Sequence, residues 1–291
     1  MATVTTPERV SPETGGTSGR QRARRPVGRW LGDHLILVVG ILVLLYMFVP
    51  IGYIFALSFN QPSGRSATAE LESFTWSNWT SICEPEGLCE SLRLSLAVGA
   101  VSTVIATILG TLMAFALVRH SFRGRSSSNL LIFLPMATPE VVMGSSLLAM
   151  FVSVGADSAL GFTSLVIAHV LFCLSFVVVT VKARLSGMDY RLEQAAMDLY
   201  ATEWQTFRLV TLPLAMPGIV AAAMLSFSLS FDDFIVSNFT AGQSVTFPLF
   251  VYGSKLKDFP PQLFVVGTLM FLVSFLIVIV GTLWRRRRAE S

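Results

Sequence analysis

The sequence predicts an all-α membrane protein with six transmembrane helices, and three observations support this fold class. Of the 291 residues, 53% are hydrophobic and only 13% are charged, with a mean hydropathy of +0.66. A soluble domain carries about 25% charged residues. The apolar residues form long blocks that reach the ~20 residues needed by a spanning helix. The basic residues lie directly beside these blocks, as they do in membrane proteins.

The apolar blocks divide the chain into a membrane domain and two tails. We place the spans at about residues 34–59, 92–118, 129–153, 159–182, 211–236 and 262–284. Residues 1–30 are rich in Thr, Ser, Gly, Pro and Arg and lack an apolar pattern, which predicts a disordered cytoplasmic tail. We therefore expect a six-span domain over residues 31–284 and a basic cytoplasmic tail over residues 285–291.

The first apolar block has the basic flank of a signal peptide as well as that of a spanning helix. The block is longer than the hydrophobic region of a signal peptide, which has roughly 7–15 residues. It also lacks a convincing cleavage site of the small-x-small type. These features favour a retained span.

The distribution of basic residues predicts the orientation. With the N-terminus inside, 17 of the 21 lysines and arginines face the cytoplasm. Such a bias favours six spans with both termini cytoplasmic. Because the basic runs adjoin apolar blocks, we expect the lipid bilayer as their partner and no nucleic acid.

The three cysteines fit this topology. Cys83 and Cys89 lie in the predicted outer loop, where a pair of thiols can oxidise. Their spacing does not establish the geometry of a disulfide, so a bridge and two free thiols are both open. Cys173 lies in the fourth span and is expected to be a buried, small apolar residue. With three unclustered histidines, the sequence predicts no metal site.

The cytoplasmic loop that begins at Ser186 predicts two short helices. Four apolar residues recur at helical spacing and form one face of the first helix. They are Leu192, Ala195, Ala196 and Leu199. Ser186 or Asp189 can cap this helix, and Thr202 with Gln205 predicts a capping box for a second one. The turn between the two falls near Tyr200.

An amphipathic helix lying on the lipid headgroups is the alternative interpretation of this loop. Four acidic residues, which anionic lipid would repel, argue against it. They are Asp189, Glu193, Asp198 and Glu203. The apolar face is also narrow and contains alanine, which favours docking into a groove on a protein.

The same loop resembles the EAA motif of ABC importer permeases. The matching positions are Gln194, Ala195, Ala196, Asp198, Leu199, Tyr200, Ala201, Leu212 and Pro213. The resemblance implies a type I ABC importer permease (MetI-like) fold, with coupling helices at 186–208 that dock in a cleft on the ATP-hydrolysing subunit. Gln194 stands where Glu is usual, although Glu193 precedes it. Tyr200 stands where Gly is usual at a turn.

Three further stretches resemble the spermidine/putrescine-type branch of this family. They begin at Leu134, His169 and Leu225, and the resemblance covers about residues 34–284. Ser175 departs from the branch, where we expect Pro. The resemblance implies three partners: a second homologous permease subunit, an ABC ATPase dimer and an extracytoplasmic substrate-binding protein. It also implies that the chain is not an enzyme and holds no cofactor.

ATP and Mg²⁺ are then used by the partner ATPase. In agreement, no lysine follows a glycine in this chain, so it lacks a Walker A phosphate loop.

Acidic residues in the predicted spans suit a cationic substrate. Glu140 lies near the middle of the third span, after two prolines that predict a local break lining a cavity. Asp232 and Asp233 lie near the outer end of the fifth span, beside Phe231. Carboxylates and aromatic faces both attract alkylammonium groups. Alternatively, Glu140 bonds a neighbouring helix, and the two aspartates mark a helix end in water.

Two other functions stay open. One is an ABC importer for another solute, such as an iron chelate, thiosulfate or a sugar. The other is an ion-coupled secondary transporter, which would show an inverted repeat with paired broken helices. We find no such repeat in the sequence.

Overall fold

The computed structural model describes residues 27–64, 66–67 and 70–289. Residues 1–26 of the predicted N-terminal tail and the last two residues of the C-terminal tail lie outside the described residues. The chain divides between Gly52 and Tyr53 into two parts. The first contains most of helix α1 (Val27–Leu57), whose side chains from His34 to Gly52 are almost all exposed. Exposed apolar side chains along this stretch of the helix fit contact with lipid.

The second part is helical apart from one small hairpin. Its elements are β1 (Asn60–Gln61), β2 (Ser73–Phe74), α2 (Ser77–Thr80), α3 (Leu88–Arg119), α4 (Arg125–Ala137), α5 (Glu140–Ser153), η1 (Asp157–Ala159), α6 (Phe162–Ser186), α7 (Arg191–Asp198), α8 (Glu203–Thr206), η2 (Phe207–Thr211), α9 (Leu212–Phe231), α10 (Ile235–Thr240), α11 (Phe247–Ser254) and α12 (Gln262–Ala289). The strands β1 and β2 pair antiparallel. Here η1 is a 3₁₀-helix and η2 a π-helix.

Among the described residues, five helices are long and apolar enough to cross a membrane, and a bent pair can supply a sixth crossing. The third predicted span, 129–153, is this pair: α4 and α5 meet at 104°. The break falls at Thr138 and Pro139, and a proline following α4 accounts for its position. The prediction of a local break before Glu140 is confirmed.

Several predicted boundaries differ from the structure by a few residues. The fifth span ends at Phe231 and not at 236, because α10 begins as a separate helix at Ile235. The fourth span continues to Ser186, the last residue of α6. Helix α12 continues to Ala289, through most of the segment predicted as a tail.

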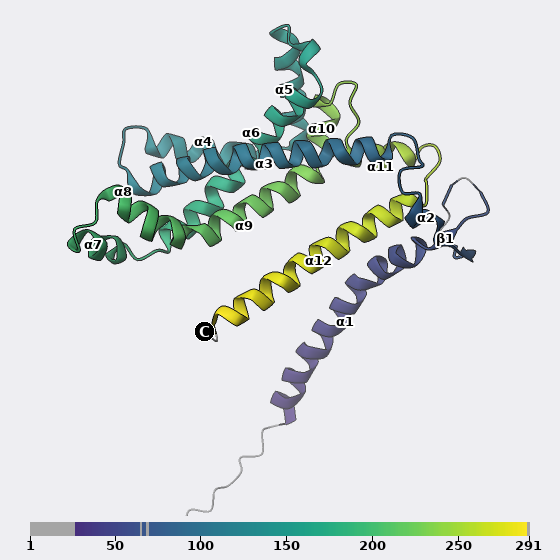
Figure 1. Ribbon diagram of the computed structural model, residues 1–291, viewed down its shortest axis with the longest axis horizontal. Helices are drawn as coiled ribbons and strands as arrows, with labels where there is room; N and C mark the ends of the chain where they lie inside the picture. Colours follow the sequence, from purple (N-terminus) through teal and green to yellow (C-terminus); the bar gives the residue numbers. More distant parts are fainter. Residues whose placement is uncertain (1–26, 65, 68–69, 290–291) are drawn as a thin grey trace, which may run out of the picture. The chain divides into compact units, whose positions relative to one another are not determined.

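The core of the second part is α6, which packs against α3 and α9 (Figure 1). The contact face of α3 is lined by small residues about one helical turn apart, among them Ala106, Gly110 and Ala114. A Cβ added at Gly110 would lie 2.6 Å from Val177 Cγ1 of α6. Small residues of this kind let helix backbones approach closely in membranes. The close approach explains why α3 has a glycine at this point.

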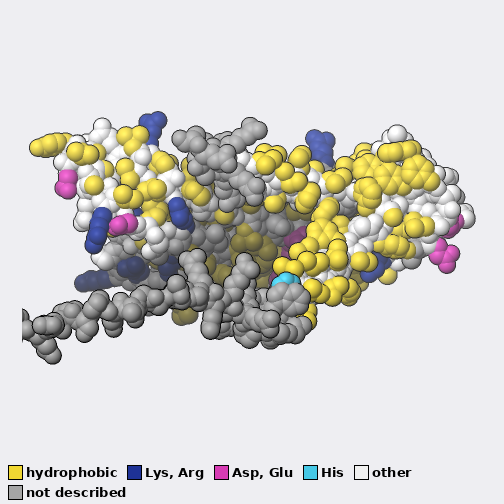
Figure 2. Space-filling model, turned by 90° about the horizontal axis from the view of Figure 1, so that it is seen from below, with side chains coloured by type: hydrophobic (Ala, Val, Ile, Leu, Met, Phe, Trp, Pro, Cys, Tyr) yellow, Lys and Arg dark blue, Asp and Glu magenta, His cyan; other side chains and the backbone are white. Residues whose placement is uncertain are grey.

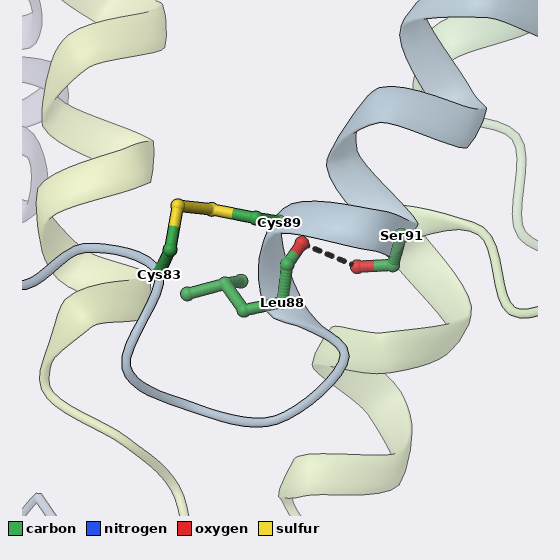
Figure 3. Close-up of a disulfide and its surroundings, with 4 residues drawn as sticks. All are labelled: Cys83, Leu88, Cys89 and Ser91. Atoms are coloured by element: carbon green, nitrogen blue, oxygen red, sulfur yellow. Dashed lines mark hydrogen bonds between the residues drawn. A yellow bond between two sulfur atoms is a disulfide. The ribbon is translucent and has the colours of Figure 1, made fainter.

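The outer loop before α3 is held by aromatic packing and a disulfide. The ring of Phe59 contacts those of Phe74 and Trp79, with centroids 5.7 and 5.2 Å away. Cys83 and Cys89 are joined by a disulfide, with Cα atoms 5.3 Å apart (Figure 3). The bridge holds the loop against the first turn of α3. It therefore fixes the position of the loop at the start of this span.

The surface is consistent with a membrane location. Hydrophobic side chains cover much of the face in Figure 2, and Lys and Arg side chains gather toward the end that holds α7 and α8. This arrangement agrees with the prediction that α7 and α8 lie on the cytoplasmic side.

Candidate functional site

The loop between α6 and α9 forms two short helices, as the sequence predicts. Asp189 Oδ1 accepts a hydrogen bond from the Arg191 backbone N–H, which turns the chain into α7. Ser186 remains part of α6. Thr202 and Gln205 form the predicted capping box of α8: Thr202 Oγ1 accepts from Gln205 N, and Gln205 Oε1 accepts from Thr202 N. The capping box starts α8 at Glu203, so four residues separate it from the end of α7 at Asp198.

Three of the four residues of the predicted apolar face of α7 are exposed in the single chain, and the fourth, Ala196, is half-buried. Leu192 and Leu199 are 49% and 82% exposed, and Ala195 is exposed beside them. Gln194 and Asp198 are also exposed. The helix thus presents apolar and polar groups together, as a surface that docks into a protein groove does.

Tyr200 makes the turn between α7 and α8. Its φ of +63° is the positive value that favours glycine, and among the described residues no other non-glycine residue has a positive φ. The left-handed conformation costs an L-residue roughly 1–2 kcal/mol. The turn thus has the positive φ that glycine would adopt at this position of the motif, although tyrosine replaces glycine. The ring is 97% exposed, so no contact within the described residues offsets this cost.

Glu193 points away from that surface and into the chain. It is buried, and its Oε1 forms an ion pair with the Arg119 guanidinium at the end of α3. The same oxygen accepts a hydrogen bond of 2.9 Å from Thr211 Oγ1, at the end of η2. The sequence placed Glu193 in the coupling motif, but spacing could not show that its partner lies 74 residues earlier.

The residues predicted for a substrate pathway fall into two environments. Glu140 is exposed in the first turn of α5, directly after the break in the third span. Asp232 is exposed at the end of α9, and Phe231 beside it is half-buried. Asp233 follows Asp232 directly in the chain. Because α5 packs against α10, which begins just after these aspartates, the segments that bear the carboxylates adjoin.

Asp233, in contrast, is buried and holds the start of α10. Its two carboxylate oxygens accept hydrogen bonds from Val236 N and Ser237 N, at 3.3 and 2.8 Å. Its Oδ2 also lies 3.5 Å from His169 Nε2. The alternative expectation was that both aspartates mark a helix end in water, whereas Asp233 caps α10 from a buried position. In the described chain, Asp232 and not Asp233 presents its carboxylate to solvent.

The sequence did not reveal the hydrogen-bond network around His169 of α6. His169 Nδ1 lies 2.6 Å from Ser230 Oγ, and Nε2 lies 3.1 Å from Ser237 Oγ. Ser230 Oγ in turn lies 3.0 Å from Ser102 Oγ of α3. The network joins α3, α6, α9 and α10 within the core. Serines inside apolar spans were the available signal, since polar groups there need partners.

Known proteins share both the sequence and the fold. The spermidine/putrescine transport system permease protein PotC of Escherichia coli (strain K12) is 37% identical over 247 residues, which cover 84% of this chain and 92% of that protein. The putrescine transport system permease protein PotI of the same strain is 32% identical over 245 residues, covering 80% of this chain and 84% of that protein.

Two solved structures share the fold at low identity. A bacterial ABC transporter involved in import of the acidic polysaccharide alginate matches with a TM-score of 0.60 at 18% identity, covering 89% of this chain and 97% of that chain. The MetNI methionine ABC transporter, in inward-facing form, matches with a TM-score of 0.55 at 17% identity, covering 70% and 96%.

A family model described as "Binding-protein-dependent transport system inner membrane component" matches residues 106–289. The match includes α6, the coupling loop and α9. Such a permease spans the inner membrane and works with a separate ATPase and a binding protein, so this chain is not the subunit that hydrolyses ATP. The chain therefore belongs to the binding-protein-dependent inner membrane components, the permease subunits of bacterial ABC importers.

Proposed function

We propose that this permease imports polyamines such as spermidine and putrescine. The observation that supports it most is the 37% identity to a spermidine/putrescine permease across 84% of the chain. The exposed carboxylates of Glu140 and Asp232 add a chemical reason. Polyamines are flexible cations, and a carboxylate with an aromatic neighbour binds an ammonium group well.

We also propose that a second homologous permease subunit completes the path. Glu140 is exposed among exposed apolar neighbours, Val141 and Val142. A carboxylate facing lipid is costly, so intramembrane carboxylates face a partner or a water-filled cavity. A second subunit facing α5 would place Glu140 in such a cavity between the two chains.

The exposed surface of α7, together with Tyr200, is the proposed docking surface for the ATPase. Leu199 and the half-buried Ala196 supply apolar contact, and Gln194 replaces the usual glutamate as the exposed polar group. Closure of the ATPase dimer on ATP would displace α7 and switch the path from one side of the membrane to the other.

Uptake of radiolabelled spermidine and putrescine tests the substrate. The complete transporter is expressed in a strain lacking its own polyamine import, with this chain either present or deleted. We expect uptake to depend on the chain. Unchanged uptake, with the protein verified in the membrane, would contradict the proposal and point to an iron chelate, thiosulfate or a sugar.

Two charge-neutralising variants test the pathway. A hydrogen bond to a charged group is worth about 1.5–3 kcal/mol, so Glu140→Gln and Asp232→Asn should each lower uptake at limiting substrate roughly tenfold or more. The matched control is Asp258→Asn, which removes an exposed carboxylate outside the proposed pathway. If all three variants take up substrate equally well, the carboxylates of Glu140 and Asp232 do not act in the pathway.

A further inference from the structure

Helix α7 is attached to the rest of the chain in an unusual way. Of its eight residues, Glu193 is the buried one. On the apolar face of this helix, Leu192 and Leu199 are exposed and Ala196 is half-buried, so apolar packing of its own holds the helix to the spans only weakly. With 3.6 residues per turn, Glu193 points about 100° away from Leu192 on that face. The exposed leucines of the docking surface and the carboxylate therefore lie on different sides of one helix, and the half-buried Ala196 lies between them.

The carboxylate of Glu193 connects three segments. Arg119, the last residue of α3, pairs with it from one side, and Thr211 of η2, which leads into α9, bonds it from another. The Arg119 guanidinium also lies 5.3 Å from the ring centroid of Tyr190, the residue before α7. The side chains of Arg119 and Glu193 are only 20% and 11% exposed, so water screens this pair less than a surface pair.

The chain itself already links α7 to two spans. It joins α6 through residues 187–190 and α9 through α8 and η2. No such short link exists to α3, which ends at Arg119, far earlier in the sequence. The pair between Arg119 and Glu193 supplies this third link. A motion of α7 can then reach α3 as well as α6 and α9.

The surroundings leave room for such a motion. Arg119, Tyr190, Glu193 and Thr211 line a cavity of about 490 Å³ at this end of the molecule. Across it, the rings of Phe115 in α3 and Phe207 in η2 contact each other with centroids 5.4 Å apart. The polar link between α3 and α7 thus lies beside an apolar contact between α3 and η2, and the cavity lies next to both.

We infer that Glu193 is a positioning residue that transmits movement of the coupling helix to α3, and not a contact to the ATPase. The inference rests on the proposed function of α7 as the ATPase docking helix. It assigns different tasks to two neighbouring residues: Gln194 faces the partner, and Glu193 faces the spans. Arg119 is its partner in this role.

The experiment uses the complete transporter in proteoliposomes, with the binding protein loaded with spermidine. Three quantities are measured: the ATPase subunit retained by the permease on purification, ATP hydrolysis stimulated by the loaded binding protein, and spermidine imported per ATP. The variants are Glu193→Gln and Arg119→Met, the exchange Arg119→Glu with Glu193→Arg, and the control Arg123→Met. Arg123 is an exposed arginine four residues beyond Arg119.

We expect both single variants to retain the ATPase and to hydrolyse ATP, while spermidine imported per ATP falls at least tenfold. The exchanged pair should recover at least a third of the wild-type ratio, and the control should match wild type. An unchanged ratio in the single variants would overturn the inference. Loss of the ATPase on purification would also overturn it, because Glu193 would then act in docking. An exchanged pair no better than the single variants would exclude the ionic link.

A second measurement separates this inference from the proposed substrate. Ala97 lines a cavity at the outer end of α3, and a cysteine placed there reports the position of α3 through its rate of labelling by an impermeant maleimide. ATP should change this rate in the wild-type transporter and not in Glu193→Gln. If wild type imports no polyamine but shows the ATP-dependent change, only the substrate proposal fails. If Glu193→Gln shows the same ATP-dependent change as wild type, the inference that Glu193 transmits movement of α7 to α3 is wrong.

Discussion

The contact between Gly110 of α3 and Val177 of α6 gives a sharp test of how the core is packed. In Gly110→Ala the new Cβ would lie 2.6 Å from Val177 Cγ1 and 2.9 Å from Val177 Cβ. Ordinary carbon contacts lie at about 3.5–4.0 Å, so the helices must separate by roughly 1 Å. Overpacking of this kind costs about 1–3 kcal/mol. Alanine gains up to about 1 kcal/mol of helix propensity over glycine, which leaves a net loss.

Thermal unfolding of the purified chain in detergent measures this loss. Cys173 is buried and free, while Cys83 and Cys89 are bridged, so a thiol-reactive fluorophore reports the opening of the core. At about 2–4 °C per kcal/mol for a chain of this size class, Gly110→Ala should lower the midpoint by a few degrees. The control is Gly281→Ala, because a Cβ at Gly281 meets nothing within 4 Å.

A double variant decides whether the clash is the cause. Val177→Ala alone removes two buried methyl groups and should also destabilise the chain. If the clash is real, adding Val177→Ala to Gly110→Ala should cost much less than it does in the wild-type chain, since neighbouring substitutions couple. A midpoint that rises in Gly110→Ala, or strictly additive losses in the double variant, would refute the close packing of α3 on α6.

Three further predictions follow from other contacts. His169→Ala should lower the unfolding midpoint more than Ser237→Ala, because it removes the hydrogen bonds to both Ser230 and Ser237, whereas Ser237→Ala removes one of them; equal shifts would show that the network is not centred on the histidine. Reduction of the Cys83–Cys89 bridge should lower the stability of the outer loop by about 2 kcal/mol, from the entropy of a loop this short, seen as faster hydrogen exchange at the start of α3; unchanged exchange would argue against it. Ala196→Asp should abolish transport while the permease stays in the membrane, because it places a charge on the proposed docking surface of α7; normal uptake by this variant would exclude that surface.

The sequence predicted the helices well where local patterns dominate. The spans follow from apolar length, and the capping box of α8 follows from Thr202 and Gln205 alone. The break before Glu140 follows from its prolines. The 104° angle of that break does not, because it depends on packing between α5 and α10, where Phe239 lies against Gly144.

The site was harder to predict because its key contacts are distant in sequence. Glu193 was placed in the coupling motif, but its direction depends on Arg119, and no local pattern shows that pair. The capping role of Asp233 could not be predicted for another reason. Residues 211–236 were taken as one span, and a carboxylate inside a helix does not cap one. Once α10 begins at Ile235, the position of Asp233 as a cap follows from its spacing to Val236 and Ser237.

The polar and apolar contacts of α3 suggest how the helix could respond to α7. Toward the cytoplasmic end it is tied by Arg119 to Glu193, and farther along it is tied by Ser102 to the network around His169. Between these points its contact face with α6 is made of small side chains at close range, where a packed interface shifts as a unit and does not bend continuously. A displacement at Arg119 should therefore move α3 as a rigid body against the serine and histidine network. Since Asp233 belongs to that network and Asp232 adjoins it, the same displacement would reach the proposed cation pathway, so the polar contacts of α3 at Arg119 and at Ser102 would act together in transmitting the motion.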